Sequence, residues 1–191
     1  MKKSIVMLAL FVSLSINAAA GANTDQTASG QKPTAAELSF IFTRQGGIAT
    51  NQFAVWIEDE RGNYLTTLYA TRFTANGGWR RRESSIPTWV KQSNIAGMTK
   101  AQADAVTVAT PKAGNLTYGW DGTDSRGADL PAGDYIICLE GTLRWESQVL
   151  YRGTIRLGQG SAAEELTPQY TGTPADSERE MISSVMLRTL R

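Results

Sequence analysis

Residues 134–157 read DYIICLEGTLRWESQVLYRGTIRL, with a short polar break at Glu146 and Ser147. The runs on either side of the break are rich in β-branched and aromatic side chains, which favour extended backbone. Two such runs joined by a short turn are typical of a β-hairpin. The sequence therefore predicts that 134–145 and 148–157 form the longest strand pair of the protein, with the lone Cys138 buried in the first strand.

The same signals recur upstream and downstream of this pair. Segment 53–58, FAVWIE, alternates with period two, and a turn at 60–63 leads into a return strand at 64–71. Further strands are predicted at 38–43, at 116–120 and, over an amphipathic-helix alternative, at 181–190. Many short strands separated by turns favour a sandwich or barrel.

The stretch 76–108 is less regular than the rest. Residues 84–91 are compatible with a short helix that has Ser85 as its N-cap and Pro87 in its first turn. A further helical turn is expected at 98–103, whereas 158–177 reads as a polar connection. The predicted fold class is therefore an all-β, immunoglobulin-like β-sandwich with a short helical insertion, and residues 36–191 form its single domain.

Composition excludes several function classes. The chain has 191 residues, no His, one Cys and a formal net charge of +1. Without His there is no Ser–His or Cys–His hydrolase, and one Cys allows neither a thiolate zinc site nor an intrachain disulfide. The near-neutral charge argues against a nucleic-acid partner.

The N-terminus has the pattern of an export signal. Lys2 and Lys3 precede a mostly apolar stretch at 5–16, and small residues at 18–22 offer a cleavage site. We expect residues 1–22 to be a cleaved signal peptide and 23–35 to be a disordered lead. The apolar stretch is too short to span a bilayer. The mature protein is then periplasmic and does not span the membrane.

Segment 120–135, WDGTDSRGADLPAGDY, is rich in turn formers. Asp121 and Asp124 can cap backbone N–H groups, Gly122 and Gly127 permit positive φ, and the Tyr135 hydroxyl can bond back to the backbone. A weaker alternative is that Asp121 and Asp124 bind calcium, although the full alternating Asp pattern is missing. The segment resembles the immunoglobulin-like repeat of the flagellar hook-capping protein.

The chain also resembles, over about 36–190, a family of predicted periplasmic proteins of unknown function. The resemblance is carried by FAVWIED at 53–59, Thr66 with LYAT at 68–71, GWRR at 78–81 and the Trp-Asp-Gly segment. Relatives of this kind resemble neighbours of iron-uptake, PepSY-type membrane reductase and FMN-transferase systems. The resemblance implies a non-catalytic accessory or binding module whose partner is an envelope protein, such as a membrane reductase.

Heptapeptide 104–110, DAVTVAT, is similar to the acceptor motif Asp-x-x-Ser/Thr-Gly-Ala-Thr of periplasmic FMN transferases. The resemblance implies that Thr110 carries FMN through a phosphoester, with Asp104, Thr107 and Ala109 completing the motif. Val108 stands where the motif has Gly, and a β-branched residue restricts φ and close approach. The alternative is that 104–110 is an ordinary strand without a cofactor.

The sequence therefore leaves three function classes open. The first is the non-catalytic binding module, and the second is a redox carrier with FMN at Thr110. The third, a His-free hydrolase, would need catalytic carboxylates from among Glu58, Asp59 and Glu60. Two further sets of residues have both a binding and a structural interpretation: Arg80–Arg82 as an anion site or a solvated edge, and Trp79, Trp89 and Tyr118 as flavin-stacking or core aromatics.

Overall fold

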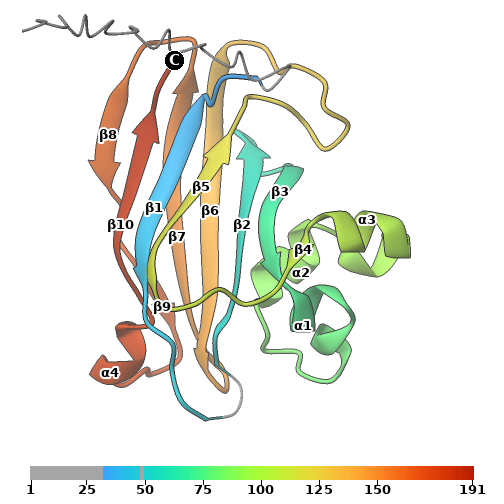
Figure 1. Ribbon diagram of the computed structural model, residues 1–191, viewed down its shortest axis with the longest axis vertical. Helices are drawn as coiled ribbons and strands as arrows, with labels where there is room; N and C mark the ends of the chain where they lie inside the picture. The colour runs from blue at the N-terminus through green and yellow to red at the C-terminus, as the bar shows by residue number, and fades with distance from the viewer. Residues whose placement is uncertain (1–31, 48–49) are drawn as a thin grey trace, which may run out of the picture. The chain divides into compact units, whose positions relative to one another are not determined.

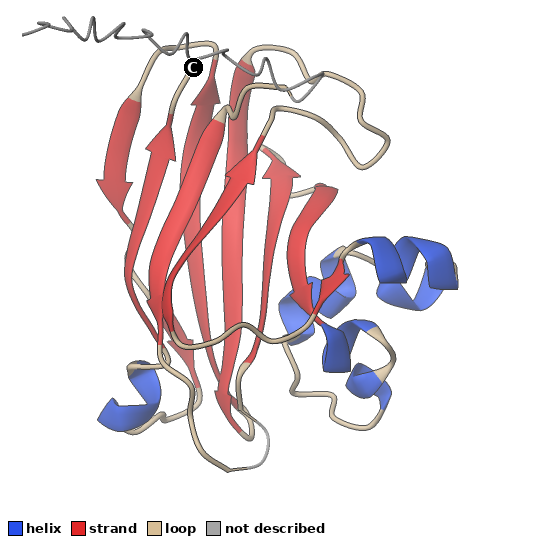
Figure 2. Cartoon of the chain, in the orientation of Figure 1, coloured by secondary structure: helices blue, strands red, loops and turns tan. Residues whose placement is uncertain are grey.

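The computed structural model describes residues 32–47 and 50–191, which form two β-sheets packed face to face (Figures 1 and 2). The predicted signal peptide and the first part of the predicted lead lie outside these ranges. The four-stranded sheet has the order β5 (Gly114–Trp120), β1 (Ala36–Phe42), β10 (Ile182–Thr189) and β8 (Ala162–Glu165). The six-stranded sheet has the order β4 (Thr107–Val108), β3 (Tyr64–Thr71), β2 (Gln52–Asp59), β6 (Gly133–Arg144), β7 (Ser147–Leu157) and β9 (Gln169–Thr171). The predicted all-β sandwich is confirmed.

The longest strand pair is β6 and β7, as expected. Their antiparallel register runs from Gly133 opposite Leu157 to Arg144 opposite Ser147. Two glycines of this pair, Gly141 and Gly153, face the other sheet. A Cβ at Gly153 would lie 2.7 Å from the Cδ2 atoms of Leu166 and Leu187, so a larger residue here would force these two side chains to move. These glycines therefore allow the two sheets to approach closely.

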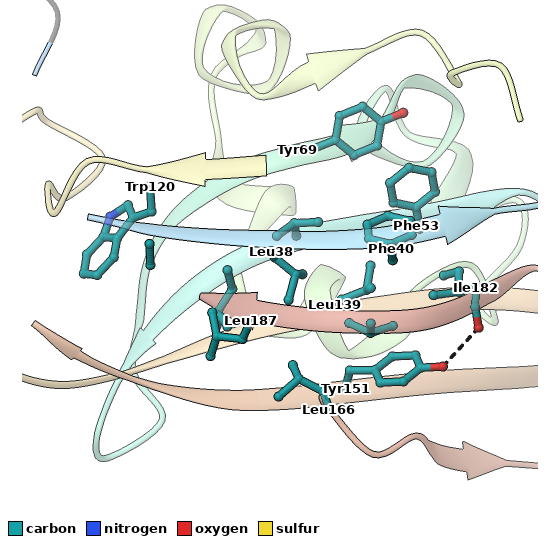
Figure 3. Packing of buried hydrophobic residues seen from close by; sticks show 14 of the residues in the cluster. Leu38, Phe40, Phe53, Tyr69, Trp120, Leu139, Tyr151, Leu166, Ile182 and Leu187 are labelled. Atoms are coloured by element: carbon teal, nitrogen blue, oxygen red, sulfur yellow. Dashed lines mark hydrogen bonds between the residues drawn. The ribbon is translucent and has the colours of Figure 1, made fainter. Parts of the chain in front are cut away.

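Aromatic rings fill the core between the sheets, as Figure 3 shows in part. Phe53 of β2 stacks on Tyr69 of β3 with ring centroids 4.6 Å apart, and Phe40 of β1 meets Phe53 edge-on at 5.6 Å. Such offset and edge contacts add to the stabilisation from burial. The Tyr151 hydroxyl donates to the Ile182 carbonyl oxygen at 3.0 Å, so its polar end is satisfied inside the core.

A second core lies on the outer face of the six-stranded sheet. Here the insertion between β3 and β4 covers Trp56 and Cys138 with Trp89 and Ile86, all four fully buried. The insertion consists of α1 (Arg72–Ala75), η1 (Gly78–Arg80), α2 (Pro87–Gln92), η2 (Ile95–Gly97) and α3 (Lys100–Ala105). Strand β2 is consequently buried on both faces, whereas period-two alternation alone usually marks a strand with one exposed face.

Buried polar contacts attach the insertion to the sheet. The Glu140 carboxylate of β6 accepts the backbone N–H groups of Thr88, at 3.0 Å, and Trp89, at 2.8 Å, in the first turn of α2. The Trp89 indole N–H donates to the Thr67 hydroxyl at 2.9 Å. The predicted cap at Ser85 is wrong, because α2 begins after Ile86 and its N–H groups are satisfied by a carboxylate distant in sequence.

Other expected elements need correction. Residues 158–177 are not only a connection, because they contain β8, β9 and the first residues of α4 (Asp176–Arg179). Helix α1 directly follows β3, and the sequence patterns did not predict it. Residues 104–110 are not one strand, since 104 and 105 end α3 and only 107 and 108 pair with β3. The final segment is the strand β10, as predicted.

The Trp-Asp-Gly segment folds as expected from its turn formers. Asp124 accepts the N–H groups of Arg126, at 2.8 Å, and Ala128, at 3.0 Å. The Tyr135 hydroxyl donates to the Pro131 carbonyl at 2.8 Å. Gly122 and Gly127 have φ of 84° and 78°, the left-handed region that favours glycine.

Trp145, at the tip of the β6–β7 hairpin, has φ of 49° and is 57% exposed. A bulky residue in this region carries steric strain, whereas Asn tolerates it. We expect Trp145→Asn to raise the free energy of unfolding by about 1 kcal/mol in chemical denaturation. Trp145→Ala is the matched control, because it also removes the ring but, unlike Asn, is not favoured in the left-handed region. Equal stabilities of the Asn and Ala variants would contradict the strain.

Candidate functional site

The FMN-motif residues lie on the chain between helix α3 and strand β5. Asp104 is in the last turn of α3, Thr107 is in β4, and Ala109 and Thr110 follow it. Strand β4 pairs with β3, in parallel, and is an edge strand of the six-stranded sheet among residues 32–47 and 50–191. The fold thus brings all four motif residues into one short segment at a sheet edge.

This segment is accessible along much of its length. Val108 is 52% exposed, Asp104 and Ala109 are exposed, and Thr110 is half-buried. Val108 does not have positive φ, so the fold does not require Gly at this position. A hydrogen bond from the Tyr69 hydroxyl to the Ala109 carbonyl, at 3.2 Å, joins the backbone beside Thr110 to the sandwich.

Two of the three polar motif side chains already have partners. The Asp104 carboxylate pairs with the exposed Lys100 ammonium group one helical turn earlier. The Thr107 hydroxyl donates to the Ala103 carbonyl. Exposed ion pairs of this kind contribute little and open readily. Asp104 therefore remains available to an approaching protein, whereas Thr107 is committed to the local turn.

The three aromatic residues considered for flavin stacking have different environments. Trp89 is fully buried under the insertion, which excludes it as a stacking surface. Tyr118 is half-buried and packs on Tyr69 with ring centroids 4.9 Å apart. Burial raises the pKa of both tyrosine hydroxyls, so they stay protonated at neutral pH. Trp79 is half-buried on the insertion.

The carboxylates expected for a hydrolase do not converge. Glu58 is fully buried, accepting the Trp56 indole N–H at 2.8 Å and the Arg152 guanidinium at 2.5 Å. Asp59 instead caps the next turn, and its side-chain hydrogen bond from Asn63 is the main cause of its lowered pKa. Because Glu58 and Asp59 are held in structural contacts and Glu60 is an exposed turn residue, these three carboxylates lack the geometry of an acid–base pair.

The two aspartates considered for calcium are likewise engaged in turns. Asp121 accepts from the backbone N–H and the hydroxyl of Thr123, at 3.1 and 2.7 Å. Backbone hydrogen bonds from Ala128 and Arg126 lower the pKa of Asp124. Within 32–47 and 50–191 no group of three or more His, Cys, Asp or Glu residues could hold a metal ion. In those ranges, moreover, no helix combines the length and apolar character needed to cross a membrane.

A known protein family matches most of the chain that the structure describes. Residues 35–173 match the family described as "Predicted periplasmic protein (DUF2271)". The chain belongs to this family. The matched part of this DUF2271 protein includes the insertion and the whole of segment 104–110. The description confirms the expected periplasmic location. Searches of curated proteins and of solved structures give no match.

A periplasmic DUF2271 protein is exposed to an oxidising environment, where a free thiol is at risk. Cys138 is fully buried, and burial, followed by the neighbouring Glu58 carboxylate, raises the pKa of its thiol. Because the thiolate is the reactive form of cysteine, this buried thiol is unreactive. The structure therefore confirms the expectation that Cys138 is buried.

Sequence reasoning missed part of a basic surface on the insertion. Besides the exposed Arg80 and Arg81 and the half-buried Arg82, the fold adds Arg72 and Phe73 from α1. Arg82 lies over the Phe73 ring at 5.0 Å, and Arg80 over the Trp79 ring at 4.8 Å. The signal in the sequence was the density of arginines between 72 and 82, which a search for contiguous motifs passes over.

Proposed function

We propose that this periplasmic protein is a non-catalytic accessory module of an envelope redox system and carries FMN covalently attached to Thr110. The observation that carries the proposal is the position of segment 107–110, which lies at a sheet edge with Val108 52% exposed. A modifying enzyme must bind several residues around the acceptor, and an edge segment allows that without unfolding the sandwich.

The departure from the motif at Val108 is compatible with this role. Val108 has ordinary extended backbone within β4, so the segment keeps its conformation with either Val or Gly. Val therefore affects only how closely the transferase can approach, because its exposed isopropyl group lies two residues before the acceptor threonine. We infer that Val108 slows the modification of Thr110 without preventing it.

The modification is a phosphoryl transfer to a hydroxyl group. The Thr110 Oγ forms a new P–O bond to the flavin phosphate of a flavin dinucleotide, and the pyrophosphate bond of that donor breaks. The nucleoside monophosphate leaves with the bonding electrons, and the Thr110 proton passes to a base of the transferase. When attached, the flavin supplies one- and two-electron chemistry, while the protein supplies position and partner contacts.

The envelope partner that this function requires is an electron donor or acceptor, such as a membrane reductase. Asp104, exposed and paired with the exposed side chain of Lys100, is a recognition point for the transferase or for that partner. Tyr69 holds the Ala109 carbonyl and thereby fixes the backbone from which the Thr110 side chain projects.

The proposal predicts a flavin adduct on the intact protein. The full-length chain is produced in a periplasm that contains an FMN transferase, and intact mass and in-gel flavin fluorescence are recorded. We expect one adduct in wild type and in Thr107→Ala, none in Thr110→Ala, and a larger modified fraction in Val108→Gly.

Each variant tests one part of the proposal. An adduct that persists in Thr110→Ala would contradict the assignment of the acceptor. A colourless wild type beside a yellow Val108→Gly variant would show that Val108 disables the motif in this chain. That result would overturn the carrier function and leave the flavin-free binding module.

A further inference from the structure

Two adjoining cavities lie on the helical insertion, on the outer side of the six-stranded sheet. One has a volume of about 440 Å³ and the other of about 410 Å³, and both are lined by Asn76, Gly77 and Arg80. Together they have the size at which proteins bind small organic ligands. We call this pair of cavities the α1–α3 groove.

The first cavity is strongly basic. Its walls include Arg72, Arg80 and Arg81, and all three side chains are exposed. Within the part of the chain that the structure describes, none of these three guanidiniums forms a salt bridge. Arg80 is held over the Trp79 ring, which limits the rotamer freedom that it would lose on binding an anion.

The second cavity combines polar residues with a group of apolar side chains. Trp79, Ile95, Met98 and Ala103 contribute to its walls, and Lys100 is the other cationic lining residue besides Arg80. The positive charge of the groove is concentrated at its arginine end, because three arginines line the first cavity whereas Arg80 and Lys100 are the cationic residues that line the second. A ligand that spans both cavities would therefore place its anionic group among the arginines and its apolar part against Trp79 and Met98.

We propose that the α1–α3 groove binds a small soluble ligand that carries a phosphate monoester on an aromatic ring system. A phosphate monoester has close to two negative charges and three acceptor oxygens, which matches several guanidiniums better than a single carboxylate does. The apolar side chains of the second cavity account for the ring. This site is independent of the flavin proposed at Thr110 and does not require it.

The test uses isothermal titration calorimetry on protein produced without a transferase, with AMP, adenosine and inorganic phosphate as probes. We expect AMP to bind about tenfold or more tightly than adenosine, because charge-assisted hydrogen bonds to the phosphate are lost in the nucleoside. The double variant Arg80→Gln/Arg81→Gln should weaken AMP binding by about tenfold or more.

The matched control removes the same charge elsewhere. Arg156→Gln/Arg188→Gln changes two exposed arginines on strands β7 and β10 and should leave AMP affinity within about twofold. Ala103→Leu narrows the second cavity and should weaken AMP binding more than it weakens the binding of inorganic phosphate. Circular dichroism melting checks that each variant is folded.

Several results would overturn the site. These are the absence of AMP binding at millimolar concentration, equal affinities for AMP and adenosine, and equal losses in the two double-arginine variants. Binding to vesicles of phosphatidylglycerol without binding to AMP would also overturn it, since the partner would then be a lipid surface.

Discussion

Arg152→Met is expected to lower the free energy of unfolding by about 3 kcal/mol, because it leaves a buried carboxylate without its cation. Glu58 is fully buried on the outer face of the six-stranded sheet, and Arg152 contacts its Oε2 at 2.5 Å. Met preserves much of the apolar stem of Arg, so the loss comes mainly from the charge. Urea denaturation at neutral pH measures it.

Two further variants isolate that cause. Arg156→Met lies on the same strand with an exposed side chain and should change stability by less than about 0.5 kcal/mol. Arg152→Met/Glu58→Gln should recover much of the loss, since a neutral amide still accepts the Trp56 indole N–H. If the double variant were as unstable as Arg152→Met, the loss would not come from an unpaired charge.

Glu140→Ala is expected to cost about 3 kcal/mol, because it leaves the N–H groups of Thr88 and Trp89 without their acceptor. The first turn of α2 then loosens over the buried Trp89. Thermal and urea unfolding measure the loss. Glu146→Ala, an exposed glutamate at the hairpin tip, is the control and should be close to neutral.

The Glu140 contact also has a pH signature. Burial raises the pKa of its carboxyl above the ordinary value of 4.5, against the opposing effect of the two N–H donors. The folded protein therefore holds this proton more tightly than the unfolded chain. The contribution of Glu140 to stability is fully present below its unfolded pKa of about 4.5 and is lost as pH rises through its folded pKa. Glu140→Gln lacks this titration. The stability of wild type relative to Glu140→Gln should be highest, and constant, below about pH 4.5 and should fall towards neutral pH. A difference that stays constant over the whole range would contradict the shift.

The strands could be predicted where side-chain alternation and β-forming residues coincide. This was the case for β2 and β3 and for the β6–β7 pair. Strands β8 and β9 were missed because every one of their residues is exposed, so no apolar period marks them. The cap of α2 was missed for another reason: Glu140 reaches it from a strand that lies about fifty residues further along the chain.

The two candidate sites differ in the same way, because one lies in consecutive residues and the other is assembled by the fold. Asp104, Thr107, Ala109 and Thr110 lie within seven consecutive residues, so a linear motif could identify them from the sequence alone. The basic cavity of the α1–α3 groove could not be found in that way. Arg72 and Phe73 follow β3, whereas Arg80 and Arg81 belong to and follow η1, and only the fold of the insertion places them around one cavity.

Attachment of flavin to Thr110 is tested most directly by tandem mass spectrometry of the tryptic peptide 101–112, AQADAVTVATPK, from protein produced with an FMN transferase. This peptide contains both Thr107 and Thr110, and its fragment ions distinguish them. We predict flavin phosphate on Thr110 and an unmodified Thr107. A peptide without flavin, or with flavin on Thr107, would contradict the proposed carrier function.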